Sequence, residues 1–220
     1  MKRYLYFLLF SCLLVASCTK DTLYLAEDPG CIQRVIIPVT AHSIAAADII
    51  TADNLLAQNN IPNNNFQYYR YQKDSTQTFF PPFAKFENKV VRVNQYTNGE
   101  RIFNKPMLFH FKNGVFDFQG GDLTKGTSLN TTPLLNLGQL RKLFIDDAQK
   151  FDNNGGQYKN TCLTAQFGYY DLNAGDHGPE VLVKAWKITG GPSPIEYPEA
   201  YYKDDDGTLI YYFNGIQYAH

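Results

Sequence analysis

The residues best suited to acid–base or metal chemistry are four histidines, scattered at His42, His110, His177 and His220. A helical zinc-hydrolase site needs two histidines one turn apart with a glutamate between them, and no His-Glu-x-x-His occurs. The chain also lacks a Gly-x-Ser-x-Gly elbow and a phosphate-binding glycine loop. We therefore predict that the protein is not an enzyme and has no catalytic residue, no metal site and no cofactor.

Two acidic motifs are weaker candidates for chemistry. Asp176-His177 has the composition of a catalytic dyad, but adjacent polar residues between glycines are more typical of a solvated loop. A calcium loop alternates its acidic ligands and ends on a glutamate. The acids of Asp204-Asp205-Asp206 are instead consecutive, so this stretch predicts a hydrophilic turn between two tyrosine-rich strands.

Aromatic residues make up 15% of the chain, with dense runs at Tyr68-Tyr69-Arg70-Tyr71 and Tyr211-Tyr212-Phe213. Such rings can stack on sugars or nucleobases, although packing within a sheet is their commoner use. A net charge of −1 gives no electrostatic basis for nucleic-acid binding, so we predict no such partner. Phe79 to Phe83 would form a partner-binding surface if exposed, but we favour a loop folded back onto the sheet.

The first 17 residues have the layout of a secretory leader. Lys2-Arg3 precedes the apolar run Leu5 to Val15, which is too short to span a bilayer as a stable helix. Val15-Ala16-Ser17-Cys18 resembles a bacterial lipobox and predicts cleavage before Cys18, with lipid on its sulfur. An ordinary signal peptide or an uncleaved anchor is the alternative. Thr19, rather than aspartate, favours the outer membrane. We therefore predict an envelope protein, anchored by lipid and facing the periplasm or the cell surface.

Cys31 and Cys162 are the only other cysteines once the leader is removed. In an oxidising compartment two cysteines can pair as a disulfide. Two buried free thiols are the alternative, and the sequence leaves both open. It does not set the oligomeric state either.

The elements that would position these residues follow from turn and periodicity signals. Asn98-Gly99 and Asn113-Gly114 divide Val90 to Gly121 into three strands, and Asn-Gly suits the tight turns of an antiparallel meander. Apolar residues recur at helical spacing in Ser43 to Asn59 and in Leu134 to Lys150. Further strands are predicted at 34–39, 66–73, 158–172, 181–188, 199–203 and 208–213. Helices and runs of sequential strands predict an α+β fold.

The meander also resembles the propeptide of thermolysin-like and fungalysin-like metalloproteases. The matching features are Gln95-Tyr96 before Asn98-Gly99, Ile102-Phe103, His110-Phe111, Asn113-Gly114 and Gly120. Residues 186–215 are similar to the PepSY domain of such propeptides, through Ala185-Trp186-Lys187-Ile188 before a tyrosine-rich strand and the Asp206-Gly207 turn.

The resemblance implies two tandem cystatin-like modules, each a helix packed on an antiparallel β-meander. The predicted boundaries are a signal peptide at 1–17, a tether at 18–33, a fungalysin/thermolysin-propeptide-like module at 34–121, a linker at 122–133 and a PepSY-like module at 134–220. The implied function is to inhibit, chaperone or dock a metalloprotease in trans, with Gln95, Tyr96 and His110 as partner contacts. The alternative is a carbohydrate- or peptide-binding accessory lipoprotein that uses the aromatic strands.

Overall fold

The computed structural model describes residues 25–152, 155–175, 178–191 and 197–215. Cys18 and His220 lie outside these residues, as do Asp176 and His177. Within the described chain the elements are β1 (Ile32–Val35), α1 (Ala46–Gln58), β2 (Phe66–Gln77), β3 (Lys85–Thr97), β4 (Glu100–Lys112), β5 (Val115–Gly120), α2 (Leu137–Phe151), the 3-10 helix η1 (Gly155–Asn160), β6 (Leu163–Asp171), β7 (Leu182–Thr189), β8 (Glu199–Lys203) and β9 (Leu209–Phe213).

The first group of elements, α1 with β2 to β5, is called here the hairpin half. Its strands pair antiparallel in chain order. Asn98 and Asn113 have φ of 52°, and each precedes a glycine with positive φ, as tight hairpin turns require. The meander predicted between Val90 and Gly121 is therefore confirmed, although its first strand starts earlier, at Lys85.

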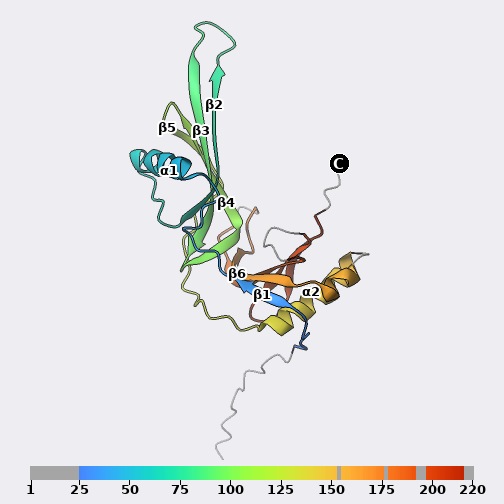
Figure 1. The fold of residues 1–220 in the computed structure, drawn as a ribbon. Helices are drawn as coiled ribbons and strands as arrows, with labels where there is room; N and C mark the ends of the chain where they lie inside the picture. The colour runs from blue at the N-terminus through green and yellow to red at the C-terminus, as the bar shows by residue number, and fades with distance from the viewer. Residues whose placement is uncertain (1–24, 153–154, 176–177, 192–196, 216–220) are drawn as a thin grey trace, which may run out of the picture.

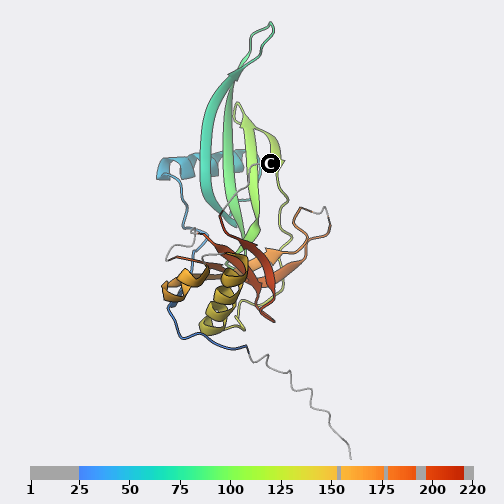
Figure 2. The same ribbon diagram turned by 90° about the vertical axis from the view of Figure 1, so that its right-hand side faces the viewer.

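Helix α1 covers one face of this meander. Its buried residues, including Leu55 and Leu56, pack against Val91, Val93 and Phe109 of the strands. Asn59 ends the helix and ties it to the β4–β5 turn: its side-chain amide donates to Gly114 O at 3.0 Å and its Oδ1 accepts from Phe116 N at 2.8 Å. Among the described residues, no helix lies against the opposite face of the meander (Figures 1 and 2).

The second group, β1, α2, η1 and β6 to β9, is called the base half. Helix α2 starts with a capping box between Asn136 and Gln139. It packs Leu140 and Phe144 on a core that includes Phe167 and Trp186. Arg141 of this helix is buried although it carries a charge, with 1% of its surface exposed.

The two halves share one sheet, and this overturns the predicted pair of cystatin-like modules. The nine strands form a single mixed sheet in the order β2-β3-β4-β6-β7-β8-β9, with β5 beside β4 and β1 beside β6. The halves join where β4 pairs parallel with β6 at Ile102 and Tyr169. Strand β1 crosses from the N-terminal segment to pair parallel with β6. The prediction of two separate helix-on-meander units is therefore wrong.

The most prominent feature of the shape is a long hairpin formed by β2 and β3 (Figure 1). Pairing between β3 and β4 stops at Asn88 and Lys112, whereas β2 and β3 stay paired out to Gln77 and Lys85. The outer part of the hairpin is thus a two-stranded ribbon that projects from the sheet. The start of the described chain, in blue, lies at the other end of the molecule (Figures 1 and 2).

Candidate functional site

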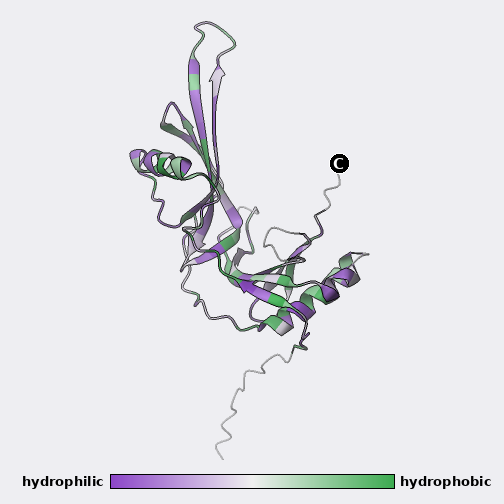
Figure 3. Ribbon diagram, in the orientation of Figure 1, coloured by the Kyte–Doolittle hydropathy of each residue, from purple (hydrophilic) through white to green (hydrophobic). Residues whose placement is uncertain are grey.

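The end of this ribbon, residues 78–84, is called here the hairpin tip. It carries three exposed phenylalanine rings: Phe79 is 92% exposed, Phe80 81% and Phe83 62%. The strands that lead to it are largely hydrophilic (Figure 3), so the tip is an isolated apolar end on a polar stalk. The predicted packing of this segment onto the sheet is wrong, because β2 and β3 carry it beyond the last residue of β4 that could cover it.

The backbone of the hairpin tip is held by one residue, Thr78. Thr78 N donates to Ala84 O at 3.0 Å, and Ala84 N donates to Thr78 Oγ1 at 2.9 Å. The hydroxyl lies 3.2 Å from Phe80 O and 3.0 Å from Pro82 O, so its single proton can be donated to either carbonyl. Pro81 and Pro82 have fixed φ angles. The tip is therefore ordered before any partner arrives, which lowers the entropy lost on binding.

Below the tip, charged side chains form a mixed collar around the ribbon. Glu87 accepts from Lys73 at 2.9 Å and from Lys89 at 2.5 Å, and these two bonds, Lys89 first, lower the pKa of its carboxyl. The Lys112 ammonium lies 3.8 Å from the centre of the Phe86 ring. An open groove of about 620 Å³ runs beside the collar, lined by Lys73, Asp74, Ser75, Lys85, Phe86, Glu87 and Asn113.

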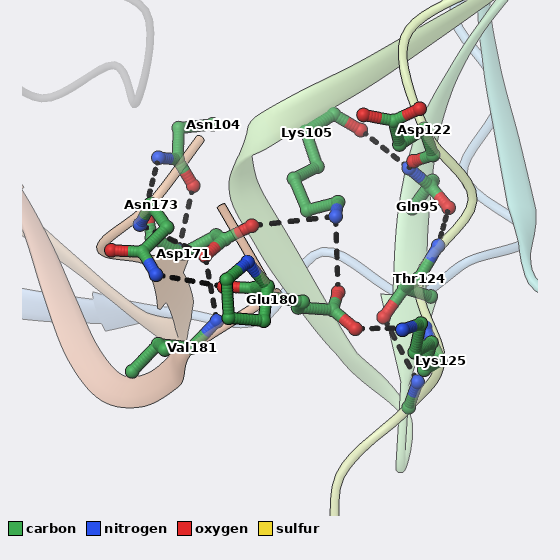
Figure 4. A network of polar contacts seen from close by, with 12 residues as sticks. Gln95, Asn104, Lys105, Asp122, Thr124, Lys125, Asp171, Asn173, Glu180 and Val181 are labelled. Atoms are coloured by element: carbon green, nitrogen blue, oxygen red, sulfur yellow. Dashed lines mark hydrogen bonds and ion pairs between the residues drawn. The ribbon is translucent and has the colours of Figure 1, made fainter. Parts of the chain in front are cut away.

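A second candidate is a polar cleft of about 470 Å³ where the two halves meet. Its centre is Lys105, whose ammonium lies 3.3 Å from an Asp171 oxygen and 3.2 Å from a Glu180 oxygen (Figure 4). All three side chains are at least nine-tenths buried. Burial alone would raise the pKa of Asp171, but amide donation from Val181 and Asn173, together with Lys105, lowers it below its ordinary value.

Amide side chains complete this cleft. Asn104 donates to Asp171 O at 2.7 Å and accepts from Asp171 N at 2.9 Å, so its side chain takes the place of a strand partner between β4 and β6. Gln95 donates to Lys105 O and Asp122 O at 3.0 and 2.9 Å and accepts from Thr124 N at 2.8 Å (Figure 4). Because these groups bond one another, we interpret the cleft as a joint that fixes the hairpin half on the base half.

The three predicted partner contacts do not form one surface. Gln95 and Tyr96 are each 1% exposed, and the Tyr96 hydroxyl donates to Ile37 O at 3.0 Å. His110 is partly exposed, stacks on Phe118 with ring centres 4.8 Å apart, and has its Nδ1 3.0 Å from Asp117 Oδ2. His110 can therefore contact a partner directly, whereas the side chains of Gln95 and Tyr96 are buried and bond to other groups of the same chain.

Other polar candidates also have internal roles. His42 Nδ1 accepts from Tyr68 N at 3.0 Å. Asp204, predicted to belong to a hydrophilic turn, is fully buried. Its carboxylate accepts from Leu134 N at 2.9 Å and Trp186 Nε1 at 2.9 Å, and lies 3.0 Å from Lys184 Nζ. Among the described residues, no three His, Cys, Asp or Glu side chains gather as a metal site would require.

Cys31 and Cys162 form a disulfide that joins the start of β1 to the start of β6. No helix of the described chain is long and apolar enough to cross a membrane. The predicted lipidation site, Cys18, lies outside the described residues.

The aromatic strands divide into one buried and one accessible set. Tyr68 is 1% exposed and belongs to the core under α1, so it cannot stack on a ligand. Tyr211 is 46% exposed and lies on β9, the last strand of the sheet. It borders an open groove of about 420 Å³ lined by Phe151, Leu209, Ile210, Tyr211, Tyr212, Phe213 and Asn214.

In comparisons with known proteins, no family model matches this chain and no curated protein is significantly similar to it.

Proposed function

We propose that this is a non-enzymatic, lipid-anchored envelope protein that docks on a partner protein through the hairpin tip. The observation that carries the proposal is the exposure of Phe79, Phe80 and Phe83 in a hydrogen-bonded loop at the end of a polar stalk. Exposed apolar clusters of this kind favour association, because three large rings in water lower solubility without adding to the core. Their place at the end of the molecule away from the start of the described chain (Figure 1) supports a protein partner over the membrane that would hold Cys18.

The energetic scale fits a specific interaction. Transfer of one phenylalanine side chain from water to an apolar pocket is worth about 1.5–3 kcal/mol. Truncation of all three rings is therefore expected to remove about 4 kcal/mol or more, a loss of about 1,000-fold in affinity. The bonds made by Thr78 keep the loop ordered, so little of this energy is spent in ordering it.

The partner class proposed is a metalloprotease, and the support for it is the propeptide resemblance of residues 95–120. A projecting loop with apolar side chains can enter a substrate cleft and exclude the substrate from it. Pro81 and Pro82 remove two backbone N–H groups from the tip, which makes the segment a poor imitation of an extended substrate at those positions. A loop that fills the cleft but is a poor substrate would block the protease without being cut. We therefore propose that the protein inhibits the protease in trans, as a separate chain.

The test is an inhibition assay with a purified thermolysin-type metalloprotease and a peptide substrate. The inhibitor is the mature chain with Cys18→Ser, so that no lipid is attached. Wild-type tip sequence should lower the rate of hydrolysis, and the triple variant Phe79→Ala, Phe80→Ala, Phe83→Ala should not. The control is Ile50→Ala with Val115→Ala, which removes two other exposed apolar groups, 63% and 66% exposed, on α1 and β5. Absence of inhibition at large excess would refute the metalloprotease, and equal inhibition by the triple variant would refute the tip.

A second candidate function is carbohydrate or peptide binding at β9. The observation that favours it is the exposed Tyr211 beside the groove of about 420 Å³. Rings on an open strand can stack on sugar faces, and a free strand edge can pair with an extended peptide. Tyr211→Ala should abolish binding to a glycan or peptide array without unfolding the chain. Binding that survives this change would exclude the β9 surface.

A further inference from the structure

Three arginines of the hairpin half lie close together in the sheet, and none of them has a carboxylate partner among the described residues. Arg70 and Arg92 stand directly opposite each other on β2 and β3. Arg101, on β4, donates from its Nη2 to Asn94 Oδ1 at 3.0 Å, and Asn94 lies two residues beyond Arg92, on the same face of β3. In the part of the chain that the structure describes, none of the three forms an ion pair.

A β-bulge brings the first two arginines together. Tyr68 faces the core opposite Val93, and strict alternation would turn Arg70, two residues further on, to the same buried face. The register shifts by one residue between Tyr68 and Arg70, and this places Arg70 opposite Arg92 on the open face instead. Bulges re-aim side chains in this way and are frequent beside functional sites.

The arrangement is unfavourable for stability. Like charges directly opposite each other on neighbouring strands destabilise a sheet. In addition, the Nε atoms of Arg92 and Arg101 are both buried and have no hydrogen-bond acceptor. A buried donor without a partner lowers stability, because it loses its bonds to water and gains none. Arg92 and Arg101 share this deficit, and no ion pair among the described residues neutralises either guanidinium, so the positive charge of the face is left uncompensated.

Nearby carboxylates do not compensate these charges. On the same face, Asp74 accepts from Asn88 Nδ2 at 3.0 Å, and Asp117 is engaged by His110 at 3.0 Å. The strand positions next to Arg92 across the sheet are Leu108 and then Gly120. A Cβ at Gly120 would meet only the Leu108 Cβ, at 3.8 Å, so this side of the face is open.

We propose that Arg70, Arg92 and Arg101 form a binding site for an oxyanion, a phosphate or carboxylate group carried by a ligand that lies on the open sheet face. Guanidinium groups suit such anions because their N–H groups match the spacing of two oxygens. The amide chain from Arg101 to Asn94, and from Asn94 Nδ2 to Gln67 Oε1 at 2.9 Å, fixes one side of the site in advance. The site is separate from the hairpin tip and does not depend on the docking proposed above.

The test is a nuclear magnetic resonance titration of the arginine Nε–Hε signals in the ¹⁵N-labelled mature chain with Cys18→Ser. The Nε–H groups of Arg92 and Arg101 are the reporters, and Arg141, whose Nε donates to Asp28 at 2.7 Å, is the internal reference. Sodium phosphate is added in one arm and sodium acetate in the other, at constant ionic strength set with sodium chloride. We expect the Arg92 and Arg101 signals to shift and saturate in the millimolar range, while Arg141 does not move.

The variants make the outcome decisive. Arg70→Gln should weaken binding several-fold without lowering the melting temperature, because it also removes the like-charge pair. Arg70→Lys keeps the positive charge but lacks the planar guanidinium with its paired N–H donors, so it should retain only part of the affinity for the anion. Tighter binding of phosphate would identify a phosphorylated ligand, and equal or tighter binding of acetate a carboxylate ligand. Shifts that fail to saturate in both arms, or that match the shift of Arg141, would overturn the site.

Discussion

Removal of the Cys31–Cys162 disulfide is expected to lower the stability of this chain strongly. The bridge closes a loop across a sequence separation of 131 residues. Chain entropy for a loop of this length gives about 5 kcal/mol, because the link restricts the unfolded chain. That is comparable with the whole free energy of unfolding of many domains, about 5–15 kcal/mol.

The native state should survive the change. β1 remains paired with β6 over four residues, and Cys31 O still accepts from Arg141 Nη1 at 2.7 Å. The double variant Cys31→Ala, Cys162→Ala should therefore fold, with its free energy of unfolding lowered by about 3–5 kcal/mol.

Urea unfolding with linear extrapolation measures this difference. The dependence on urea should become steeper, because the unlinked chain exposes more surface when it unfolds. Wild-type protein unfolded in the presence of a reductant is the matched control and should show the same loss. A loss below about 1 kcal/mol would refute the chain-entropy reasoning, since the loop length alone predicts several times more.

Three further predictions concern the groups that hold the base and the joint. Arg141→Met should lower the free energy of unfolding by about 3–5 kcal/mol in urea, because Asp28 and the carbonyls of Cys31 and Thr161 lose their buried donor; a loss under about 1 kcal/mol would contradict this role. The pKa of Asp171 lies below its ordinary value of 3.8, so its carboxylate stabilises the fold above that pH and this contribution is lost as the pH falls through the lower, folded-state pKa. In the variant Asp171→Asn, the free energy of unfolding should therefore fall less steeply as the pH is lowered below 3.8. The same fall in the variant and in the wild type would exclude Asp171 as its cause. Gly121→Ala should lower the free energy of unfolding by about 1–3 kcal/mol, because φ is +85° and the new Cβ would lie 2.7 Å from Pro106 O; Gly120→Ala, whose new Cβ would make only an ordinary contact with Leu108 Cβ at 3.8 Å, is the control and should be tolerated in the same thermal melt.

Local signals in the sequence predicted most of the elements but not how they join. The Asn-Gly pairs fixed both hairpin turns, because few other dipeptides accept positive φ at low cost. The crossing of β1 to β6 had no such signal: Ile32–Val35 is short and could pair with any open edge. The single β4–β6 contact at Ile102 and Tyr169 depends on side chains far apart in sequence, such as Asn104 and Asp171. The prediction of two separate modules came from the propeptide resemblance, and no local signal in the sequence opposed it.

The sequence indicates the candidate site without deciding its exposure. Phe79 to Phe83 would form a partner-binding surface if exposed, and only the extra length of β2 and β3 beyond β4 exposes it. The sequence does not indicate the burial of Arg141 and Asp204, because charged residues are rarely buried and the partners of these two are mainly backbone groups, which every residue has. Arg70 lies opposite Arg92 only because of a one-residue bulge, and no residue type in Tyr68 to Arg70 indicates that a bulge occurs there.

The central claim is that the hairpin tip contacts a partner protein, and site-specific photo-crosslinking in the cell tests it most directly. A photoreactive amino acid is placed at Phe80 in the full-length chain, and at Ile50 on α1 as an exposed control, with each variant expressed at its native level. The account predicts a discrete crosslinked protein from position 80 that is absent from position 50. No crosslink from position 80, or the same products from both positions, would contradict it.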